Sequence, residues 1–261
     1  MEPYEIIRPL GKGAFGETFL IRGVETGKLS AMKRLPKENN DLEMVKSEID
    51  ILSHLEKKCK KHVLCYELAI DDEEDNSYKI FTEYLEGYIP LDEYINNTPD
   101  EERWQALPTI RRNLVDGMED IHSLDVAHRD IKPSNTLINP KTLQTKIIDF
   151  GVSCLKNQCA TDKSLAGTPI YMDPQVNFKL PKIEVPLNLN TYKKFDIWSL
   201  GVTLIEYILG ERRFYQALTK QIKPQDMFTL IPNSFKNHYP KTMRILHHML
   251  TTNPQYRSVY D

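Results

Sequence analysis

Hydrophobic and polar positions in the first third of the chain follow the pattern of short β-strands. Apolar or β-branched stretches are separated by glycine-bearing turns, as is typical of strands. They cover residues 5–10, 18–22, 28–35, 63–70 and 78–84. An acidic stretch at residues 71–75 lies between the last two and is expected to form a solvated hairpin loop. The pattern predicts a β-rich first region.

A helical period of apolar residues appears once within this region. Leu42, Val45, Ile49 and Leu52 recur at three- and four-residue steps. This spacing puts their side chains on one face of an α-helix. The β-rich region is therefore predicted to contain one amphipathic helix.

Helical patterns dominate the rest of the chain. Helices are expected around residues 107–121, 195–209 and 243–250, and the second is apolar on most faces, as in a helix buried within its lobe. The prediction is an α+β fold with two lobes in one domain, residues 1–261. A small β-rich lobe with one helix and a hinge covers residues 1–85, and a larger, mainly helical lobe covers residues 86–261.

Composition and charge restrict the class of protein. The chain has 261 residues and a formal net charge of -3, without the positive excess of a general nucleic-acid binder. No run approaches the roughly 18 apolar residues that span a bilayer, and residues 1–9 lack the apolar core of a signal peptide. We expect an intracellular protein, cytoplasmic or nuclear, that binds no nucleic acid and does not span a membrane.

The four cysteines stand at positions 59, 65, 154 and 159. They are too few to suggest a disulfide framework in a chain of this size. Their spacing, with His62 nearby, matches a zinc site poorly. We expect reduced thiols, and nothing in the sequence around Cys154 and Cys159 indicates a lowered pKa that would make them redox-sensitive.

Gly11, Gly13 and Gly16 form a G-x-G-x-x-G run after the first predicted strand. Glycine allows the backbone to approach phosphates closely. The run alone also fits a dinucleotide-binding turn or a plain turn. A dinucleotide site needs the run to open a helix, whereas residues 17–21 are β-prone. The pattern favours a flexible lid over a nucleotide.

A lysine and a glutamate form a candidate ion pair. Lys33 stands near the end of a predicted strand, and Glu48 lies at the margin of the apolar stripe of the predicted helix. A glutamate that faces inward needs a partner, and Lys33 is the natural one. Their pairing would hold an ammonium group against phosphates.

Two polar motifs follow in the second half. Asp130, Lys132 and Asn135 belong to the run H-R-D-I-K-P-S-N, and Asp149 opens D-F-G after an apolar strand. Asp130 could accept the proton of an attacking hydroxyl and Lys132 could neutralise the moving phosphoryl group. Asn135 and Asp149 offer the oxygen ligands that Mg2+ prefers.

These motifs together resemble the eukaryotic-type protein kinase family, whose signature comprises a glycine-rich loop, a strand lysine, H-R-D-L-x-x-x-N and D-F-G. The resemblance extends from about residue 4 to residue 257. Residues 167–172 resemble the segment that seats the substrate residue, and residues 196–201 resemble the start of the large lobe's central helix. Residues 253–257 resemble the late arginine motif. Lys132 and Thr168 are typical of the serine/threonine class.

The resemblance implies an enzyme that uses ATP and Mg2+ to phosphorylate serine or threonine hydroxyls of a protein substrate. The implied catalytic residues are Asp130, Lys132, Lys33 and Glu48, and the implied metal ligands are Asn135 and Asp149. The implied nucleotide-binding residues are Leu10, Gly11, Gly13, Gly16, Thr18, Ala31, Lys33, Thr82, Glu83, Leu85 and Leu137. Among them, Thr82 would be the gatekeeper, and residues 83–85 would be the hinge whose backbone binds adenine.

The chain departs from the family pattern at several positions. Thr18 replaces the usual valine over the adenine, and Asp173-Pro174-Gln175 replaces Ala-Pro-Glu. The family's glutamate would pair with Arg257; Gln175 can still form a hydrogen bond but lacks the charge, so the large lobe is expected to lose some stability there. Residues 176–194 form a stretch longer than usual, which could shape substrate docking and is more simply explained as a tolerated surface insertion. The chain also ends just after Arg257, before a closing helix would be complete, as in a truncated sequence.

Regulation and alternative functions follow from the same resemblance. Arg129 could pair with a phosphate on Thr161 or Ser164 and so order the activation segment, or could bond only to backbone. The alternative function is a pseudokinase scaffold that binds nucleotide without turnover. A small-molecule kinase is a further alternative, which the substrate-seating segment around Thr168 disfavours.

Overall fold

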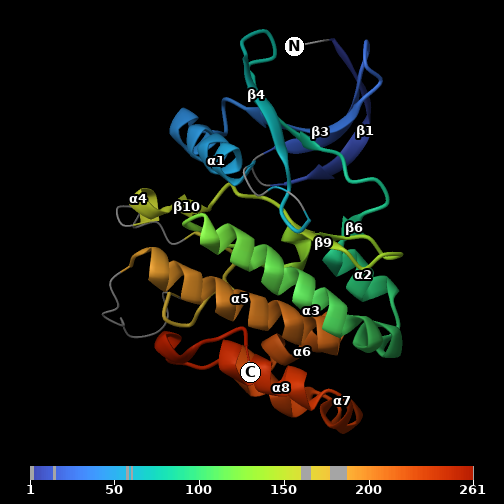
Figure 1. Cartoon of the computed structure of the whole chain (residues 1–261), viewed down its shortest axis with the longest axis vertical. Helices are drawn as coiled ribbons and strands as arrows, with labels where there is room; N and C mark the ends of the chain where they lie inside the picture. Colours follow the sequence, from blue (N-terminus) through green and yellow to red (C-terminus); the bar gives the residue numbers. More distant parts are fainter. Residues whose placement is uncertain are drawn as a thin grey trace.

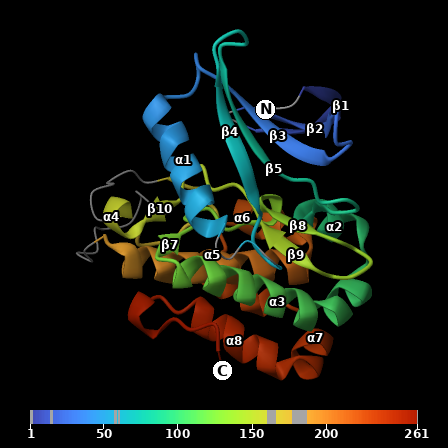
Figure 2. The same cartoon turned by 45° about the horizontal axis from the view of Figure 1, so that its top comes forward.

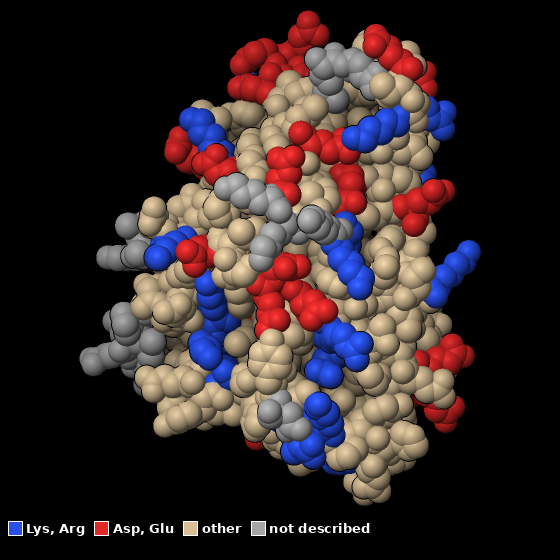
Figure 3. Space-filling view, viewed as in Figure 1, with Lys and Arg blue, Asp and Glu red and all other residues tan. Residues whose placement is uncertain are grey.

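The computed structural model describes residues 3–13, 16–56, 59, 61–159, 166–176 and 187–260. A β-sheet with one helix forms the upper part of the molecule, and helices form most of the lower part (Figure 1). The two-lobed α+β fold predicted from the sequence is therefore confirmed. In Figure 3, acidic and basic side chains are interspersed over the visible face, in keeping with the small net charge.

The upper part is a five-stranded antiparallel sheet with the order β1-β2-β3-β5-β4. Its strands are β1 (Tyr4–Lys12), β2 (Glu17–Gly23), β3 (Leu29–Pro36), β4 (Tyr66–Asp72) and β5 (Ser77–Glu83). All five lie where the apolar stretches predicted strands, although β4 begins three residues later. β5 ends at Glu83 and the next element begins at Ile89. The division of the lobes between residues 85 and 86 falls in this gap and stays a prediction.

The predicted amphipathic helix is α1 (Leu42–Leu55), and it lies alongside β4 (Figure 2). Asp41 caps its first turn by accepting a hydrogen bond from the backbone nitrogen of Glu43 at 3.3 Å. The buried face carries Val45, Ile51 and Leu52. Glu48 is buried on the same face, as its position beside the apolar stripe predicted.

The acidic stretch between β4 and β5 is less solvated than predicted. Asp72 accepts from Nζ of Lys79 at 2.7 Å, and Asp75 pairs with Arg34 through contacts of 2.5 and 2.6 Å. These two aspartates are only partly exposed because basic side chains on β3 and β5 lie within reach, whereas the other three residues of the stretch are exposed, as predicted.

Two long helices cross the middle of the lower part, α3 (Asp100–Ser123) and α5 (Leu189–Leu209) (Figure 1). Every residue from 195 to 209 is buried, so the predicted burial of that helix is confirmed. The predicted helix near residue 243 is α8 (Pro240–Met249), and the other helices are α2 (Leu91–Asn97), α4 (Lys156–Cys159), α6 (Glu211–Thr219) and α7 (Asn233–His238).

Short strands in the lower part border the sheet above them. β7 (Val126–Ala127) pairs with β10 (Cys154–Leu155) in a two-stranded sheet. β8 (Thr136–Ile138) pairs with both β6 (Ile89–Pro90) and β9 (Thr145–Ile147) in a three-stranded sheet. Within the described residues, 3-10 helices are formed by Pro133–Asn135, Pro224–Leu230 and Pro254–Tyr256. None of the helices within the described ranges combines the length and the apolar character needed to cross a membrane.

The cysteines correct the sequence prediction. The structure joins Cys59 to Cys65 and Cys154 to Cys159 as disulfides, where reduced thiols were expected. Each pair is close along the chain, and local turns bring the Cα atoms to 4.7 and 5.2 Å, within the span of a disulfide. The count of cysteines could not reveal this proximity.

Candidate active site

Three of the predicted site residues meet between the two lobes. Lys33 on β3 places its Nζ atom 2.7 Å from Oε1 of Glu48 on α1 and 3.3 Å from Oδ1 of Asp149. Glu48 is 7% exposed. A buried carboxylate of this kind requires a cationic partner, and the structure supplies it from the neighbouring strand.

The charges of this trio stabilise one another. Burial opposes protonation of Lys33, but Glu48 and Asp149 together hold its pKa above the ordinary value. Burial likewise opposes ionisation of Asp149, but Lys33 and His128 hold its pKa below the ordinary value. The site therefore keeps a fixed positive charge next to a fixed negative one.

A second cluster surrounds Asp130. Its Oδ2 atom accepts from Nζ of Lys132 at 2.8 Å and from Nδ2 of Asn135 at 2.9 Å. Its Oδ1 atom accepts from the backbone nitrogen of Thr168 at 2.8 Å, and Lys132 also donates to Oγ1 of Thr168 at 2.6 Å. The carboxylate is thereby fixed in orientation by two sequence-distant segments.

The central helix holds the backbone of this cluster. Asp196 on α5 is fully buried and accepts from the backbone nitrogens of His128 at 2.8 Å and Arg129 at 2.7 Å. Arg129 has φ 70°, in the left-handed region that costs energy for a non-glycine residue. Burial opposes ionisation of Asp196, but His122 and the backbone donors hold its pKa below the ordinary value. The sequence marked residues 196–201 as the start of a helix and did not identify this anchoring role.

The oxygen donors expected to bind a metal suit Mg2+ in chemical type. Asn135 uses its amide nitrogen for hydrogen bonds to the main-chain oxygen and to Oδ2 of Asp130, both at 2.9 Å. These bonds do not involve the amide oxygen, which is the atom that would bind a cation. The Asp149 side chain is 43% exposed, so its carboxylate can reach a ligand in the space between the lobes.

The glycine run connects β1 to β2, so the strand expected after it is confirmed and a dinucleotide-type helix is excluded. A Cβ atom at Gly16 would lie 2.0 Å from the backbone oxygen of Arg34, so only glycine fits there. A Cβ atom at Gly11 would meet nothing within 4 Å. Open space beside Gly11 leaves room for a ligand near the backbone.

The residues predicted to bind adenine lie on strands of both lobes. Ala31 on β3 is paired in register with Thr82 on β5. Leu10 and Thr18 lie on β1 and β2 of the same sheet, and Leu137 lies on β8 of the lower lobe. Their contact with a nucleotide stays a prediction.

The hinge has an ion pair that sequence reasoning missed. Glu83 pairs with Lys146 of β9, which is only 6% exposed, and also accepts from the backbone nitrogen of Cys65 at 2.9 Å. The backbone nitrogen of Glu83 donates to the oxygen of Cys65 at 3.0 Å. The amide of Glu83 therefore already has a partner within the chain.

The partner of Arg257 corrects another expectation. Arg257 forms its ion pair with Asp173, and both side chains are 0% exposed. Gln175 instead donates from Nε2 to the backbone oxygen of Thr252 at 3.0 Å. The arginine is therefore not left without a charged partner, because an aspartate two residues earlier supplies the carboxylate. The signal in the sequence was Asp173, which stands where the family has alanine and supplies the carboxylate that Gln175 lacks.

A buried carboxyl group also contacts the segment expected to seat the substrate. Tyr171 donates from its hydroxyl to Oε2 of Glu206 on α5 at 2.6 Å. Burial raises the pKa of Glu206 to about 7, although the bond from Tyr171 opposes this shift. The group therefore titrates near neutral pH.

Comparison with known proteins identifies related chains. The chain matches the protein kinase domain family over residues 4–260. It is 32% identical to calcium-dependent protein kinase 20 of Oryza sativa subsp. japonica over 244 residues, which cover 91% of this chain and 41% of that protein. Serine/threonine-protein kinase dst4 of Dictyostelium discoideum is 33% identical over 207 residues, which cover 78% of this chain and 40% of that protein. The chain thus spans less than half the length of these relatives.

Proposed function

Because this chain belongs to the protein kinase domain family, we propose that it transfers the γ-phosphoryl group of ATP to serine or threonine hydroxyls of protein substrates. The observation that carries the proposal is the network in which Lys132 contacts both Asp130 and Thr168. In this network a carboxylate, an ammonium group and a threonine hydroxyl lie within hydrogen-bond reach of one another, as the proposed reaction would require.

The nucleotide would lie between the lobes. Lys33, held by Glu48, would bind the α- and β-phosphates, and Asp149 and Asn135 would hold Mg2+, which neutralises phosphate charge when bound. The glycine run would cover the phosphates through its backbone nitrogens. The carbonyl of Glu83 and the backbone of Leu85 would bind the adenine edge.

Phosphoryl transfer would rely on positioning and electrostatics. Asp130 would orient the substrate hydroxyl and accept its proton as the oxygen attacks the γ-phosphorus. Lys132 would stabilise the charge on the transferred group. Lys132 and Thr168, which contact each other at 2.6 Å, are the residue types typical of the serine/threonine class, and this supports serine and threonine acceptors.

We also propose that phosphorylation in the activation segment regulates the enzyme. The candidate acceptors, Thr161 and Ser164, lie outside the described residues. Arg129 stacks its guanidinium over the ring of Tyr192 at 4.8 Å, and a nearby phosphate would compete for this cation. Phosphate mapping of the active protein tests this, and an active form without modification at either residue contradicts it.

The direct test is transfer of labelled phosphate from ATP and Mg2+ to a generic basic protein, followed by analysis of the phosphorylated amino acids. Label on serine or threonine supports the proposal. Label on tyrosine alone contradicts the serine/threonine assignment. No transfer despite ATP binding would favour the alternative, a scaffold without turnover.

A further inference from the structure

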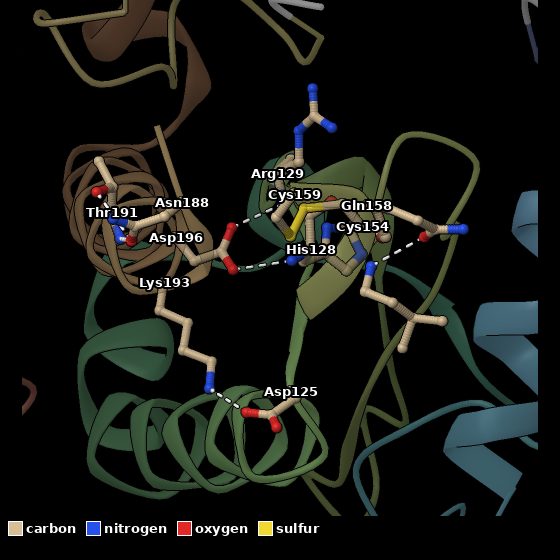
Figure 4. The surroundings of a disulfide bond; sticks show 12 residues. Asp125, His128, Arg129, Cys154, Gln158, Cys159, Asn188, Thr191, Lys193 and Asp196 are labelled. Atoms are coloured by element: carbon tan, nitrogen blue, oxygen red, sulfur yellow. Dashed lines mark hydrogen bonds and ion pairs between the residues drawn. A yellow bond between two sulfur atoms is a disulfide. The ribbon is translucent and has the colours of Figure 1, made fainter. Parts of the chain in front are cut away.

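The disulfide between Cys154 and Cys159 lies in the segment that leads from Asp149 toward Thr168. Cys154 begins β10 and Cys159 ends α4. Figure 4 shows the sulfur bridge beside His128, Arg129 and Asp196. The two cysteines are 1% and 0% exposed, so this disulfide is buried.

The disulfide closes a short turn between β10 and α4. α4 has four residues, too few for a helix to be stable alone. The backbone nitrogen of Lys156 donates to the oxygen of Asp125 at 3.0 Å, and that of Leu155 donates to Oε1 of Gln158 at 3.0 Å. Loss of the sulfur bond would remove the covalent constraint on this turn.

The disulfide also packs against residues that support the site. Cys154 and Cys159 form one apolar cluster with Ala127, Leu189, Tyr192 and Phe195. The guanidinium of Arg129 lies over the ring of Tyr192. A change in the packing of the disulfide therefore acts on the residue directly before Asp130.

A second connection runs through the backbone. β10 pairs with β7, with Cys154 opposite Ala127, and His128 follows Ala127 directly. Ser153 donates from its hydroxyl to the oxygen of His128 at 3.0 Å. The segment that contains the disulfide and the chain that carries Asp130 are thus joined side by side.

We propose that Cys154–Cys159 is a reversible redox modification site, opened by dithiol reductants and closed by small-molecule disulfides, whose closed state holds the segment in the arrangement suited to phosphoryl transfer. The inference rests on the proposed kinase function for its effect on activity.

The chemistry is thiol–disulfide exchange. A thiolate of the dithiol attacks one cysteine sulfur, which breaks the Cys154–Cys159 bond and forms a mixed disulfide. The second thiol of the reductant then attacks this mixed bond and releases the other thiol. The protein gains two electrons and two protons, and the dithiol loses both as it becomes a cyclic disulfide. Because both sulfurs are buried, α4 must open before the attack.

Opening the disulfide should lower turnover of the protein substrate more than ATP affinity. The segment closed by the disulfide is bonded to Ala127 and His128, just before Asp130, whereas Lys33 and Glu48 lie on β3 and α1. We expect kcat/KM for the protein substrate to fall about fivefold or more on reduction, within the usual range of coupling between distant sites.

The experiment compares wild type with two double variants. The protein is oxidised with glutathione disulfide or reduced with dithiothreitol, and the state of each cysteine is read by alkylation and peptide mass spectrometry. Cys154→Ser with Cys159→Ser removes the proposed site, and Cys59→Ser with Cys65→Ser is the matched control that keeps it. We expect wild type and the control to lose activity on reduction and recover it on reoxidation, and the first variant to be low and unresponsive.

Three results would overturn the inference. The first is equal activity of wild type in both states while the mass spectra show the disulfide open and closed. The second is loss of the response in the Cys59/Cys65 variant alone, and the third is failure of glutathione disulfide to join Cys154 to Cys159.

The test also separates this inference from the kinase proposal. If no form transfers phosphate, the kinase proposal fails, and amide hydrogen exchange decides the redox site. Faster exchange at Leu155 and Lys156 after reduction of the control variant supports the modification site, and unchanged exchange refutes it.

Discussion

The buried pair of Asp173 and Arg257 allows a quantitative test of how the large lobe is held. Replacing Asp173 by asparagine keeps the shape but removes the charge, so the guanidinium of Arg257 remains buried without its counter-ion. Breaking such a pair from one side costs about 3–5 kcal/mol. At roughly 2 °C per kcal/mol for a chain of this size, the melting temperature should fall by about 6–10 °C.

The assay is thermal and denaturant unfolding of a double-mutant cycle, with Asp173→Asn, Arg257→Met and both changes together. We expect the double variant to be less destabilised than the sum of the single variants, because it leaves no unpaired charge. Gln175→Ala is the matched control. It removes one partly exposed hydrogen bond to Thr252 and should cost about 1 kcal/mol.

The reasoning is refuted if Asp173→Asn unfolds within about 0.5 kcal/mol of wild type. It is also refuted if Gln175→Ala is the more destabilising of the two changes. That result would mean that the glutamine still carries the role of the family's glutamate.

Two further predictions use other contacts. The pKa of Glu206 is raised to about 7 from an ordinary 4.5. Its protonated form therefore contributes fully to stability below pH 4.5, and this contribution is lost as the pH rises through 7. In pH-dependent unfolding, wild type should lose up to about 3 kcal/mol relative to Glu206→Gln over this range. An equal pH dependence in both proteins would refute the shift. Gly16→Ala should cost about 1–3 kcal/mol because its Cβ atom would meet the oxygen of Arg34. Gly11→Ala, with open space around it, should leave stability unchanged in the same unfolding assay, and equal losses would contradict the model of the loop.

Local patterns in the sequence were sufficient for most of the fold. The four apolar residues from Leu42 to Leu52 identified α1 because a helix must present such positions on one face. The apolar character of residues 195–209 on most helical faces identified the buried α5. Both signals depend on the chain's own period and need no knowledge of neighbours.

The site was predictable to the extent that its residues belong to motifs. Lys33, Glu48 and Asp149 are far apart in the chain, yet their types and order indicated a shared site, and the structure brings them within hydrogen-bond distance. Lys146 carries no such motif. Its ion pair with Glu83 depends on how β9 meets the hinge, which only the packed structure shows.

The wrong predictions share a physical cause. The partner of Arg257 was inferred from the position that Gln175 occupies. A buried cation can pair with any carboxylate that reaches it, and Asp173 does so. Cys154 and Cys159 were judged by their number in the chain, whereas pairing depends on a turn that places the Cα atoms 5.2 Å apart. Side-chain reach across a turn is not encoded in composition.

The central claim is that this chain transfers phosphate through Asp130, and parallel measurement of turnover and ATP affinity in Asp130→Asn tests it most directly. The substitution keeps the hydrogen-bonding shape next to Lys132 and Thr168 but removes the proton acceptor. We predict that kcat falls at least about 100-fold while the Kd for ATP and Mg2+ stays close to that of wild type. Transfer to serine or threonine at an undiminished rate would contradict the account.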